Sequence, residues 1–208
     1  MKALILVDLQ NDFVKVGSLA VKGGEELAVL ANNLMPSFDL LIATQDFHPA
    51  GHGSFAPSPD KIGTVAKLNG LDQVLWPVHC VEGTYGAEFL EDLDVDRLDK
   101  IVQKGCDPDI DSYSGFFDNG RLKETELNAY LQAKGVTELY VLGLATDYCV
   151  KYTALDAVSL GYKTFLIEDA CRGVEINDGD IAKAIAEMKQ AGIEIIKTND
   201  LAEKLCLI

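Results

Sequence analysis

Short apolar runs alternate with longer amphipathic segments along the chain. The first run, Ala-Leu-Ile-Leu-Val at residues 3–7, has no polar member, which is typical of a strand in a sheet covered on both faces. Six runs of this kind predict strands at residues 2–7, 40–44, 100–103, 138–142, 162–167 and 193–197. Between them, apolar residues recur at helical spacing and predict helices at residues 25–34, 123–134, 149–160 and 178–190, with a short helical tail from residue 199.

This alternation predicts the fold class. Strands that alternate with helices form α/β proteins, so we expect a doubly wound parallel sheet of about six strands with helices on both faces. No linker interrupts the pattern, which predicts a single domain over residues 1–208. Residues 47–81 have little regular pattern and many Gly, Pro and Ser residues. A loop of that length in a compact domain is more often functional than idle.

Composition narrows the class of protein and of partner. The chain has 208 residues, of which 48% are hydrophobic, enough for a substantial core. With 18 basic and 33 acidic residues its formal charge is −15, which disfavours nucleic acid and anionic membranes as partners. No apolar run approaches membrane-spanning length, and the first run is too short for a signal sequence. Five cysteines without a CxxC pair indicate a reducing, cytoplasmic location. A small neutral molecule is therefore the expected partner.

Reactive residues follow four of the predicted strands. Asp8 follows the first, Asp46 and His48 the second, Lys104 the third and Cys149 the fourth. Since the carboxyl ends of parallel strands form the ligand-binding edge of an open sheet, we expect these side chains to meet in one crevice. An acid, an ammonium group and a thiol are the groups that nucleophilic acyl chemistry requires. Taken singly, Asp8 is also compatible with a turn cap and Lys104 with a surface residue.

Cys149 lies at the predicted junction between a strand and a helix. The strand at residues 138–142 is interrupted by Gly-Leu-Ala-Thr-Asp at 143–147, after which the helical pattern begins. A thiol in the first turn of a helix experiences the positive end of the helix dipole, which lowers its pKa and favours the thiolate. The sequence therefore predicts a reactive nucleophile, with an ordinary buried cysteine as the alternative.

A second group of residues has the composition of a metal site. Asp46 and His48 stand two apart at a strand end, and His79 comes from the long loop. Three protein ligands leave positions open, as in catalytic metal sites, and mixed Asp/His ligation suits zinc as well as iron or manganese. Ser54 is a candidate fourth ligand or an outer anchor for a water on the metal, and His52 competes for that role. Both His52 and His79 are also compatible with ordinary polar loop residues.

Five segments together resemble the isochorismatase-like cysteine hydrolase superfamily, nearly end to end. Residues 7–13 (VDLQNDF) and 143–150 (GLATDYCV) resemble its acid and nucleophile motifs, which also occur in metal-free members. The metal-binding segments of its nicotinamidase branch are similar to residues 45–49 (QDFHP) and 76–80 (WPVHC). Lys104-Gly105 followed by residues 111–116 (DSYSGF) also fits that branch.

The resemblance implies a metal-containing hydrolase that deamidates nicotinamide to nicotinate and ammonia through a thioester, accepts pyrazinamide as well, and acts in NAD salvage. In this chemistry Cys149 is the nucleophile, Asp8 takes and returns its proton, and Lys104 holds Asp8 and favours the thiolate. The backbone N–H groups of Ala145 and Cys149 form the oxyanion hole. The peptide bond before Ala145 is cis in this family.

The resemblance also implies one divalent metal ion and an apolar ring site. Zinc is the first choice of metal, with iron(II) or manganese(II) as alternatives, and the implied ligands are Asp46, His48 and His79. The ion binds the ring nitrogen, which turns the carboxamide towards Cys149. Relatives differ at the fourth ligand position, so Ser54 leaves the coordination number open. The expected walls of the ring site, each also compatible with ordinary packing, are Phe13, Leu19, Trp76 and Tyr113.

Two alternative functions stay open. One is a related hydrolase that acts on another small amide or on isochorismate. Bound metal together with activity on pyridine carboxamides would favour the nicotinamidase branch over this alternative. The other is a non-catalytic module that binds a metabolite or a metal. The joint presence of Asp8, Lys104 and Cys149 speaks against this second alternative. Oligomeric state is not predicted, and the sequence is compatible with a homo-oligomer.

Overall fold

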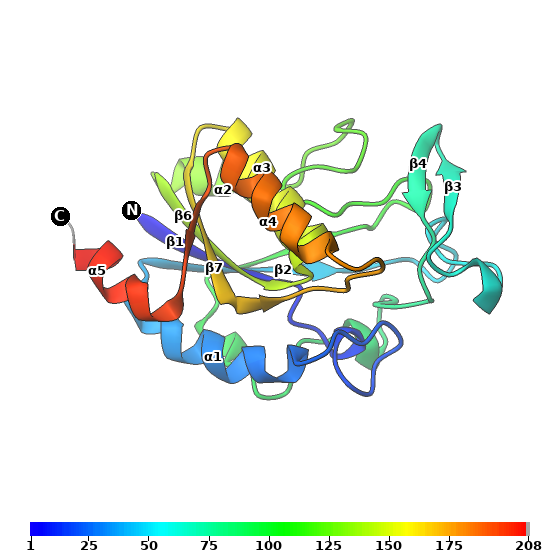
Figure 1. Ribbon diagram of the computed structural model, residues 1–208, viewed down its shortest axis with the longest axis horizontal. Helices are drawn as coiled ribbons and strands as arrows, with labels where there is room; N and C mark the ends of the chain where they lie inside the picture. Colours follow the sequence, from blue (N-terminus) through cyan, green and yellow to red (C-terminus); the bar gives the residue numbers. More distant parts are fainter. Residues whose placement is uncertain (207–208) are drawn as a thin grey trace.

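A six-stranded parallel sheet forms the centre of the computed structural model, which describes residues 1–206 (Figure 1). All neighbouring strands in it run parallel, in the order β5-β2-β1-β6-β7-β8. Their bounds are β1 Lys2–Val7, β2 Leu40–Asp46, β5 Lys100–Lys104, β6 Glu138–Leu144, β7 Lys163–Arg172 and β8 Glu194–Ile196. The predicted α/β fold with a doubly wound sheet is confirmed.

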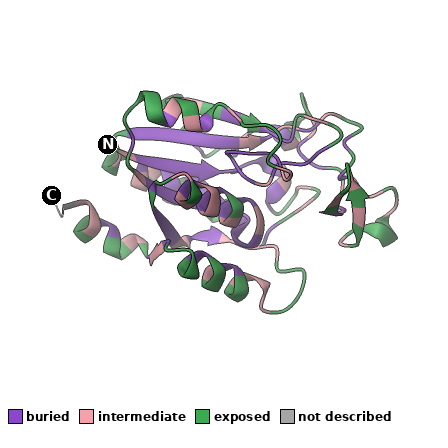
Figure 2. Ribbon diagram, turned by 90° about the horizontal axis from the view of Figure 1, so that it is seen from above, coloured by how far each residue is buried: buried purple, intermediate pink, exposed green. Residues whose placement is uncertain are grey.

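Helices cover both faces of this sheet. Figure 1 shows α1 on one side and α2, α3 and α4 on the other, and Figure 2 shows the buried strands between them. The helices are α1 Leu27–Leu34, α2 Leu127–Ala133, α3 Lys151–Ser159, α4 Asp180–Gln190 and α5 Leu201–Cys206. In α4 the buried residues Ala184 and Met188 are four positions apart, which places both on the face towards the sheet. No helix within residues 1–206 has the length and apolar character needed to cross a membrane.

The order of the strands creates a switch point between β1 and β6. From β1 the chain first builds outwards through β2 and β5, and it then returns to add β6, β7 and β8 on the other side. Ligands bind beyond the carboxyl ends of the strands at such a point, because the connecting segments on its two sides leave in opposite directions. Asp8 directly follows β1, and Ala145 directly follows β6.

The long loop contains a β-hairpin that the sequence pattern did not predict. Strands β3 Val65–Leu68 and β4 Leu71–Val74 pair antiparallel and project beyond the end of the sheet in Figure 1. Most of their residues are exposed or half-buried, so no apolar run marks them. The turn at Asn69 and Gly70 has positive φ at both residues, 49° and 80°, as a tight hairpin turn requires. This Asn-Gly pair was the available sequence signal.

Several helices begin later than the pattern predicts, and α4 for example begins at Asp180 rather than at residue 178. The helix expected from residue 123 begins at Leu127, because the Asp118 carboxylate accepts the backbone N–H groups of Leu122 and Lys123, at 2.9 Å each, and holds them in a turn. The first helix begins at Leu27 after a short 3-10 turn, Gly24–Glu26. Cys149 lies in a π-helical turn, Thr146–Val150, rather than at the start of α3.

The last strands and the tail also differ slightly from the prediction. Strand β7 continues to Arg172, well beyond the expected end at residue 167, because Glu168 and Asp169 interrupt the apolar run without interrupting the strand. The final strand, β8, has only three residues. The expected tail from residue 199 forms α5 after a 3-10 turn, Thr198–Asp200.

Candidate active site

Four buried residues meet at the switch point of the sheet. Asp8 follows β1, while Asp46 and Lys104 are the last residues of β2 and β5. Cys149 reaches the same place from the π-helical turn after β6. None of the four is more than 7% exposed. The structure therefore brings together the side chains that were expected to meet at the strand ends.

Lys104 occupies the centre of this group. Its Nζ lies 2.9 Å from Asp8 Oδ2 and 3.4 Å from Cys149 Sγ, and it donates hydrogen bonds to Asp46 Oδ1 and to the backbone oxygen of Ser112. Burial alone would lower the pKa of the ammonium, but the two carboxylates outweigh burial and hold it well above its usual value. Lys104 is therefore a permanent cation in contact with both the acid and the thiol.

Asp8 is held in a constrained position beside the thiol. Its backbone has a φ of 50°, and its Oδ1 accepts a 2.6 Å hydrogen bond from the Thr44 hydroxyl. Oδ2 forms an ion pair with Lys104 Nζ at 2.9 Å. A carboxylate oxygen of Asp8 lies within 4.8 Å of Cys149 Sγ. Burial raises the pKa of Asp8, with Lys104 opposing this effect, so the carboxylate has an enhanced affinity for a proton.

The predicted low pKa of Cys149 is wrong. Burial raises the pKa of its thiol well above the usual value, Lys104 opposes this shift, and the carboxylates of Asp8 and Asp46 add to it. A helix terminus lowers a thiol pKa only where that effect exceeds the cost of desolvating the anion. Here the thiol lies in a π-helical turn, buried beside two carboxylates. Cys149 is therefore a thiol at rest, and it requires a base.

The predicted ring site forms one small cavity above these groups. All four expected wall residues border it, namely Phe13, Leu19, Trp76 and Tyr113. Ala145 and Cys149 line it as well, which is the placement that an oxyanion hole requires, and the peptide bond between Leu144 and Ala145 is cis. Its volume is about 30 Å³. A larger cavity of about 500 Å³ is also lined by Lys104, but Cys149 does not border it.

Three further residues of the cavity were not predicted: Asp111, Tyr148 and Val174. Tyr148 precedes Cys149, and its ring centroid lies 4.8 Å from that of Trp76 at an interplanar angle of 86°. Its position next to the nucleophile was an available signal. Val174 has no signal in the sequence, because its segment is placed by the Asp147 carboxylate, which accepts the Val174 backbone N–H at 2.9 Å.

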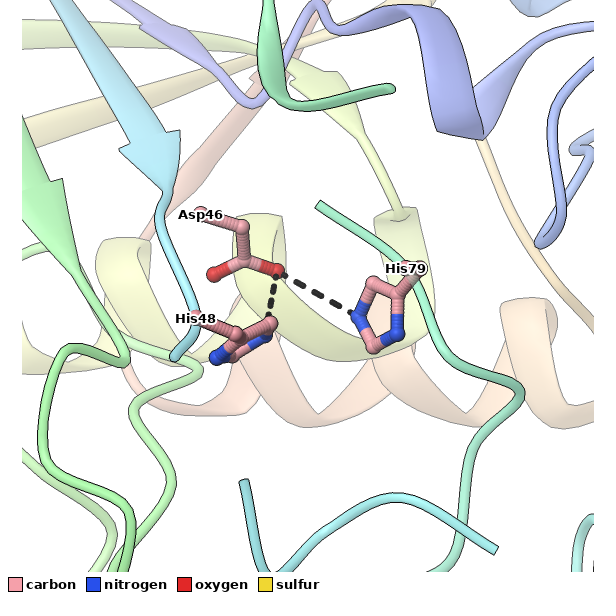
Figure 3. A group of neighbouring side chains, drawn as sticks. All are labelled: Asp46, His48 and His79. Carbon is pink, nitrogen blue, oxygen red and sulfur yellow. Dashed lines mark ion pairs between the residues drawn. The ribbon is translucent and has the colours of Figure 1, made fainter. Parts of the chain in front are cut away.

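Asp46, His48 and His79 form the candidate metal centre shown in Figure 3. Asp46 Oδ2 lies 3.6 Å from His48 Nε2 and 3.7 Å from His79 Nε2. The Nδ1 atom of each ring lies 2.8 Å from a backbone oxygen, that of Gly105 for His48 and that of Pro77 for His79. Each Nδ1–H therefore points to its backbone oxygen, and each Nε2 faces the Asp46 carboxylate. This arrangement fits a divalent metal ion with open positions.

The charge on Asp46 also favours a cation. Although burial opposes ionisation, Lys104 and His48 hold the pKa of Asp46 well below its usual value. Burial lowers the pKa of His48, but the neighbouring Asp46 carboxylate raises it, and the net result is an increase to about 8. One carboxylate oxygen of Asp46 contacts Lys104 and the other faces the two histidines. Asp46 therefore joins the metal group to the acid–thiol group.

Ser54 and His52 lie beside this centre and are bonded to each other. The Ser54 hydroxyl is 2.7 Å from His52 Nδ1, and the His52 ring centroid is 4.4 Å from that of His48. Burial lowers the pKa of His52, which keeps the ring neutral. His52 also forms a second group with His48 and Asp111, whose ligand atoms lie within 4.8 Å of one another. His48 Nδ1 already contacts the Gly105 backbone oxygen, so only its Nε2 is free to bind a metal. The two groups share this atom, and the second group therefore extends the same centre.

The chain belongs to the isochorismatase family, whose domain model matches residues 2–200. It is 46% identical over 207 residues to the nicotinamidase of Escherichia coli strain K12, covering 97% of each protein. Among solved structures, a nicotinamidase/pyrazinamidase of Acinetobacter baumannii has 41% identity, coverage of 96% and 97%, and a TM-score of 0.92. A pyrazinamidase of Pyrococcus horikoshii in complex with zinc has 37% identity, coverage of 94% and 98%, and a TM-score of 0.75. The resemblance noted in the sequence is confirmed.

Proposed function

We propose that this protein is a metal-containing nicotinamidase that hydrolyses nicotinamide to nicotinate and ammonia, accepts pyrazinamide, and serves NAD salvage in the cytoplasm. The observation that carries the proposal is that one small aromatic cavity borders both the nucleophile Cys149 and the metal ligands Asp46 and His79. Nicotinamide carries a ring nitrogen and a carboxamide on one flat ring, and so needs both groups at once. The family and the 46% identical nicotinamidase support this substrate class. We take residues 1–208 as one functional domain.

In the proposed acylation step, Asp8 takes the proton of Cys149 while the sulfur attacks the amide carbon. The developing oxyanion accepts hydrogen bonds from the backbone N–H groups of Ala145 and Cys149. Asp8 then gives its proton to the amide nitrogen, the carbon–nitrogen bond breaks, and ammonia leaves a thioester on Cys149. The raised pKa of Asp8 suits this exchange, because it gives the carboxylate a greater affinity for the thiol proton, while the raised pKa of Cys149 keeps that proton on sulfur until the attack begins.

In the proposed deacylation step, Asp8 takes a proton from water, and the hydroxide equivalent attacks the thioester carbon. The carbon–sulfur bond breaks, Asp8 returns its proton to the sulfur, and the product carboxyl loses the other water proton to solvent and leaves as nicotinate. Lys104 holds Asp8 through both steps, since its Nζ lies 2.9 Å from Asp8 Oδ2 and 3.4 Å from Cys149 Sγ. Its charge offsets each anion that forms beside it.

We propose that one divalent cation is held by Asp46, His48 and His79, with zinc first and iron(II) or manganese(II) as alternatives. When bound, it supplies a Lewis-acid position for the ring nitrogen of the substrate. The oriented Nε2 atoms of the two histidines, each fixed by a 2.8 Å contact of Nδ1 with a backbone oxygen, support this assignment. Ser54 is proposed as an outer group or a fourth ligand, since its hydroxyl lies beside this centre. The apolar contacts of the ring are assigned to Phe13, Leu19, Trp76 and Tyr113.

The test is release of ammonia from nicotinamide by the purified protein, with metal analysis of the same sample. We expect turnover together with about one equivalent of a divalent metal per chain. A panel containing benzamide, other small amides and isochorismate serves as the comparison. Turnover of another compound in the panel without turnover of nicotinamide would assign the chain to a different hydrolase of the family, and no turnover at all would favour a binding module.

A further inference from the structure

Gln73 is a buried polar residue in an otherwise exposed hairpin. It lies on β4 and is 2% exposed, whereas its neighbour Asp72 forms an ion pair with Lys67 in which both side chains are more than 60% exposed. Side chains alternate between the two faces of a strand, so Asp72 points to solvent and Gln73 points towards the body of the protein. A buried amide has a large desolvation cost unless its hydrogen bonds are formed, which makes its partners informative.

The partners of Gln73 belong to the wall of the cavity. Its Nε2 lies 2.9 Å from Asp111 Oδ2 and 3.0 Å from the Tyr113 hydroxyl. Its Oε1 accepts a hydrogen bond from Asn119, whose own Oδ1 accepts the Tyr113 backbone N–H at 3.0 Å. Asp111 and Tyr113 both line the cavity. Gln73 itself does not border the cavity, so it acts on the site only through these residues.

The Tyr113 hydroxyl links Gln73 to the indole of Trp76. Trp76 Nε1 donates to that hydroxyl at 3.1 Å, and the Gln73 amide approaches the same oxygen with two N–H groups that it shares among this hydroxyl, Asp111 and the Val74 backbone oxygen at 2.8 Å. Trp76 follows β4 by two residues and is 4% exposed. The hairpin amide, the phenol and the indole are therefore joined through a single oxygen atom. If the amide is removed, the phenol loses one of the two donors that fix its position.

We propose that Gln73 is a positioning residue that holds Trp76 and Tyr113 against the cavity and thereby sets the affinity for the substrate ring. This inference rests on the proposed function for the identity of the ring. It extends that function to the β3–β4 hairpin, which contributes no group to the chemistry. Gln73 contacts neither Cys149 nor Asp8 in the described structure, so its influence falls on binding rather than on bond breaking.

The wall of the cavity lies partly outside the central sheet. Trp76 and Tyr113 both line the cavity, and Trp76 follows β4 by two residues. The hairpin forms a separate two-stranded sheet, so the ladder of the central sheet does not fix these two side chains. Their positions depend instead on side-chain hydrogen bonds such as those to the Tyr113 hydroxyl. Bonds that hold the wall in place around the ring strengthen binding.

The test compares Gln73→Leu with the matched control Asp72→Asn on the same strand. We expect the leucine variant to raise KM for nicotinamide roughly tenfold with kcat within about twofold, the loss typical of removing a buried hydrogen-bond partner. The control should match the wild type in both constants. Trp76 is the single tryptophan of the chain, so its emission reports on the wall without any substrate. A shifted emission in Gln73→Leu is expected, and none in Asp72→Asn.

A double-mutant cycle separates positioning from general loss of structure. In a Tyr113→Phe background, Gln73→Leu should raise KM much less than it does in the wild type, because the shared hydroxyl is already absent. Gln73→Glu, of similar size, provides a second variant if the leucine protein does not fold. A folded Gln73 variant with unchanged KM and unchanged Trp76 emission overturns the proposal. If the wild type does not hydrolyse nicotinamide, the proposed function fails, whereas the emission comparison still tests the link to Trp76.

Discussion

At the scale of single residues, the buried charges explain how one carboxylate can serve as both base and acid. Asp8, Asp46 and Lys104 together carry one net negative charge, and a thiolate at Cys149 would add a second in the same desolvated space. The proton therefore stays on sulfur until an electrophile arrives. Burial also raises the pKa of Asp8, so the carboxylate that accepts the thiol proton has a greater affinity for it than an ordinary aspartate has.

The first prediction concerns the nucleophile. Cys149→Ala should lower ammonia release from nicotinamide by roughly 10⁴-fold or more, because no other thiol lies beside Asp8 and Lys104 in the described structure. Cys80→Ala is the matched control, since Cys80 is also buried and adjoins the candidate metal ligand His79. Circular dichroism should show both variants folded. Substantial activity in Cys149→Ala combined with its loss in Cys80→Ala would reverse the assignment.

The second prediction separates Asp8 from Lys104. Asp8→Asn should slow acylation by roughly 10²–10⁴-fold, because an amide cannot take the thiol proton. Lys104→Arg keeps the positive charge and should leave residual activity, although the larger guanidinium must fit a site that is 2% exposed. Single-turnover experiments that follow the acyl-enzyme by mass measure this step directly. Acylation of Asp8→Asn at the wild-type rate would remove Asp8 from the role of base.

Residue types at the strand ends could be predicted from the sequence, but their electrostatics could not. Asp8, Lys104 and Cys149 are recognisable because each follows an apolar run. The direction of the Cys149 pKa shift depends on burial next to Asp46, a residue more than a hundred positions away, which no local pattern encodes. Gln73 was missed for the same reason, since its partners lie 38 and 40 residues further along the chain.

At the scale of elements, fully apolar strands were predictable and the turns that follow them were not. Strand β1 matches its predicted bounds because every residue from Ala3 to Val7 is 0% exposed. The end of β6 depends on Gly143, which has a φ of 126° and on which a Cβ would stand 2.2 Å from the backbone oxygen of Val7. This close approach joins the ends of β1 and β6, and so places Asp8 near Cys149.

The third prediction tests how the turn after β5 places His48. Gly105 has a φ of 68°, and a Cβ added there would lie 2.4 Å from His48 Cε1. Gly105→Ala should therefore displace the imidazole and weaken metal binding by roughly 10- to 100-fold, beyond the backbone strain of about 1–2 kcal/mol. The measurement is a metal titration, supported by thermal unfolding.

Gly135→Ala is the matched control for this variant. Gly135 has a φ of 69°, and nothing lies within 4 Å of an added Cβ, so it reproduces the backbone strain without the contact with His48. We expect a similar loss of thermal stability in both variants and a loss of metal affinity only in Gly105→Ala. Equal metal affinity in the two variants would show that His48 tolerates the displacement.

At the scale of the whole molecule, the candidate site is assembled from distant parts of the chain. Asp46 ends β2 and His48 follows it by two residues, His79 comes from the long loop, and Cys149 follows β6. The fold class could be predicted because the alternation of strands and helices extends over the whole chain, and the parallel sheet then dictates which ends converge. The formal charge of −15 still predicts that nucleic acid is not a partner. The contacts between the hairpin residue Gln73 and the cavity wall depend on long-range packing that has no periodic signal.

The last prediction is that the metal serves the substrate ring. The candidate ligand His79 lies beside the wall residue Phe13, with ring centroids 5.6 Å apart, and both line the cavity with Cys149. Chelation should therefore weaken hydrolysis of nicotinamide roughly tenfold or more relative to benzamide, a difference of about 1.4 kcal/mol, because benzamide has the same amide but no ring nitrogen. His79→Ala should show the same selectivity, and His52→Ala should not.

A competing account is that the metal activates the water that cleaves the thioester. Under that account both amides lose deacylation alike, and acyl-enzyme accumulates on Cys149 with either substrate. Under ring anchoring, acylation by nicotinamide slows, while benzamide is affected little at either step. Metal-replete and chelated protein should therefore be compared on both substrates, with the acyl-enzyme monitored by mass. Equal proportional loss for the two amides would refute ring anchoring, because a ligand position for the pyridine nitrogen cannot affect a substrate that lacks one.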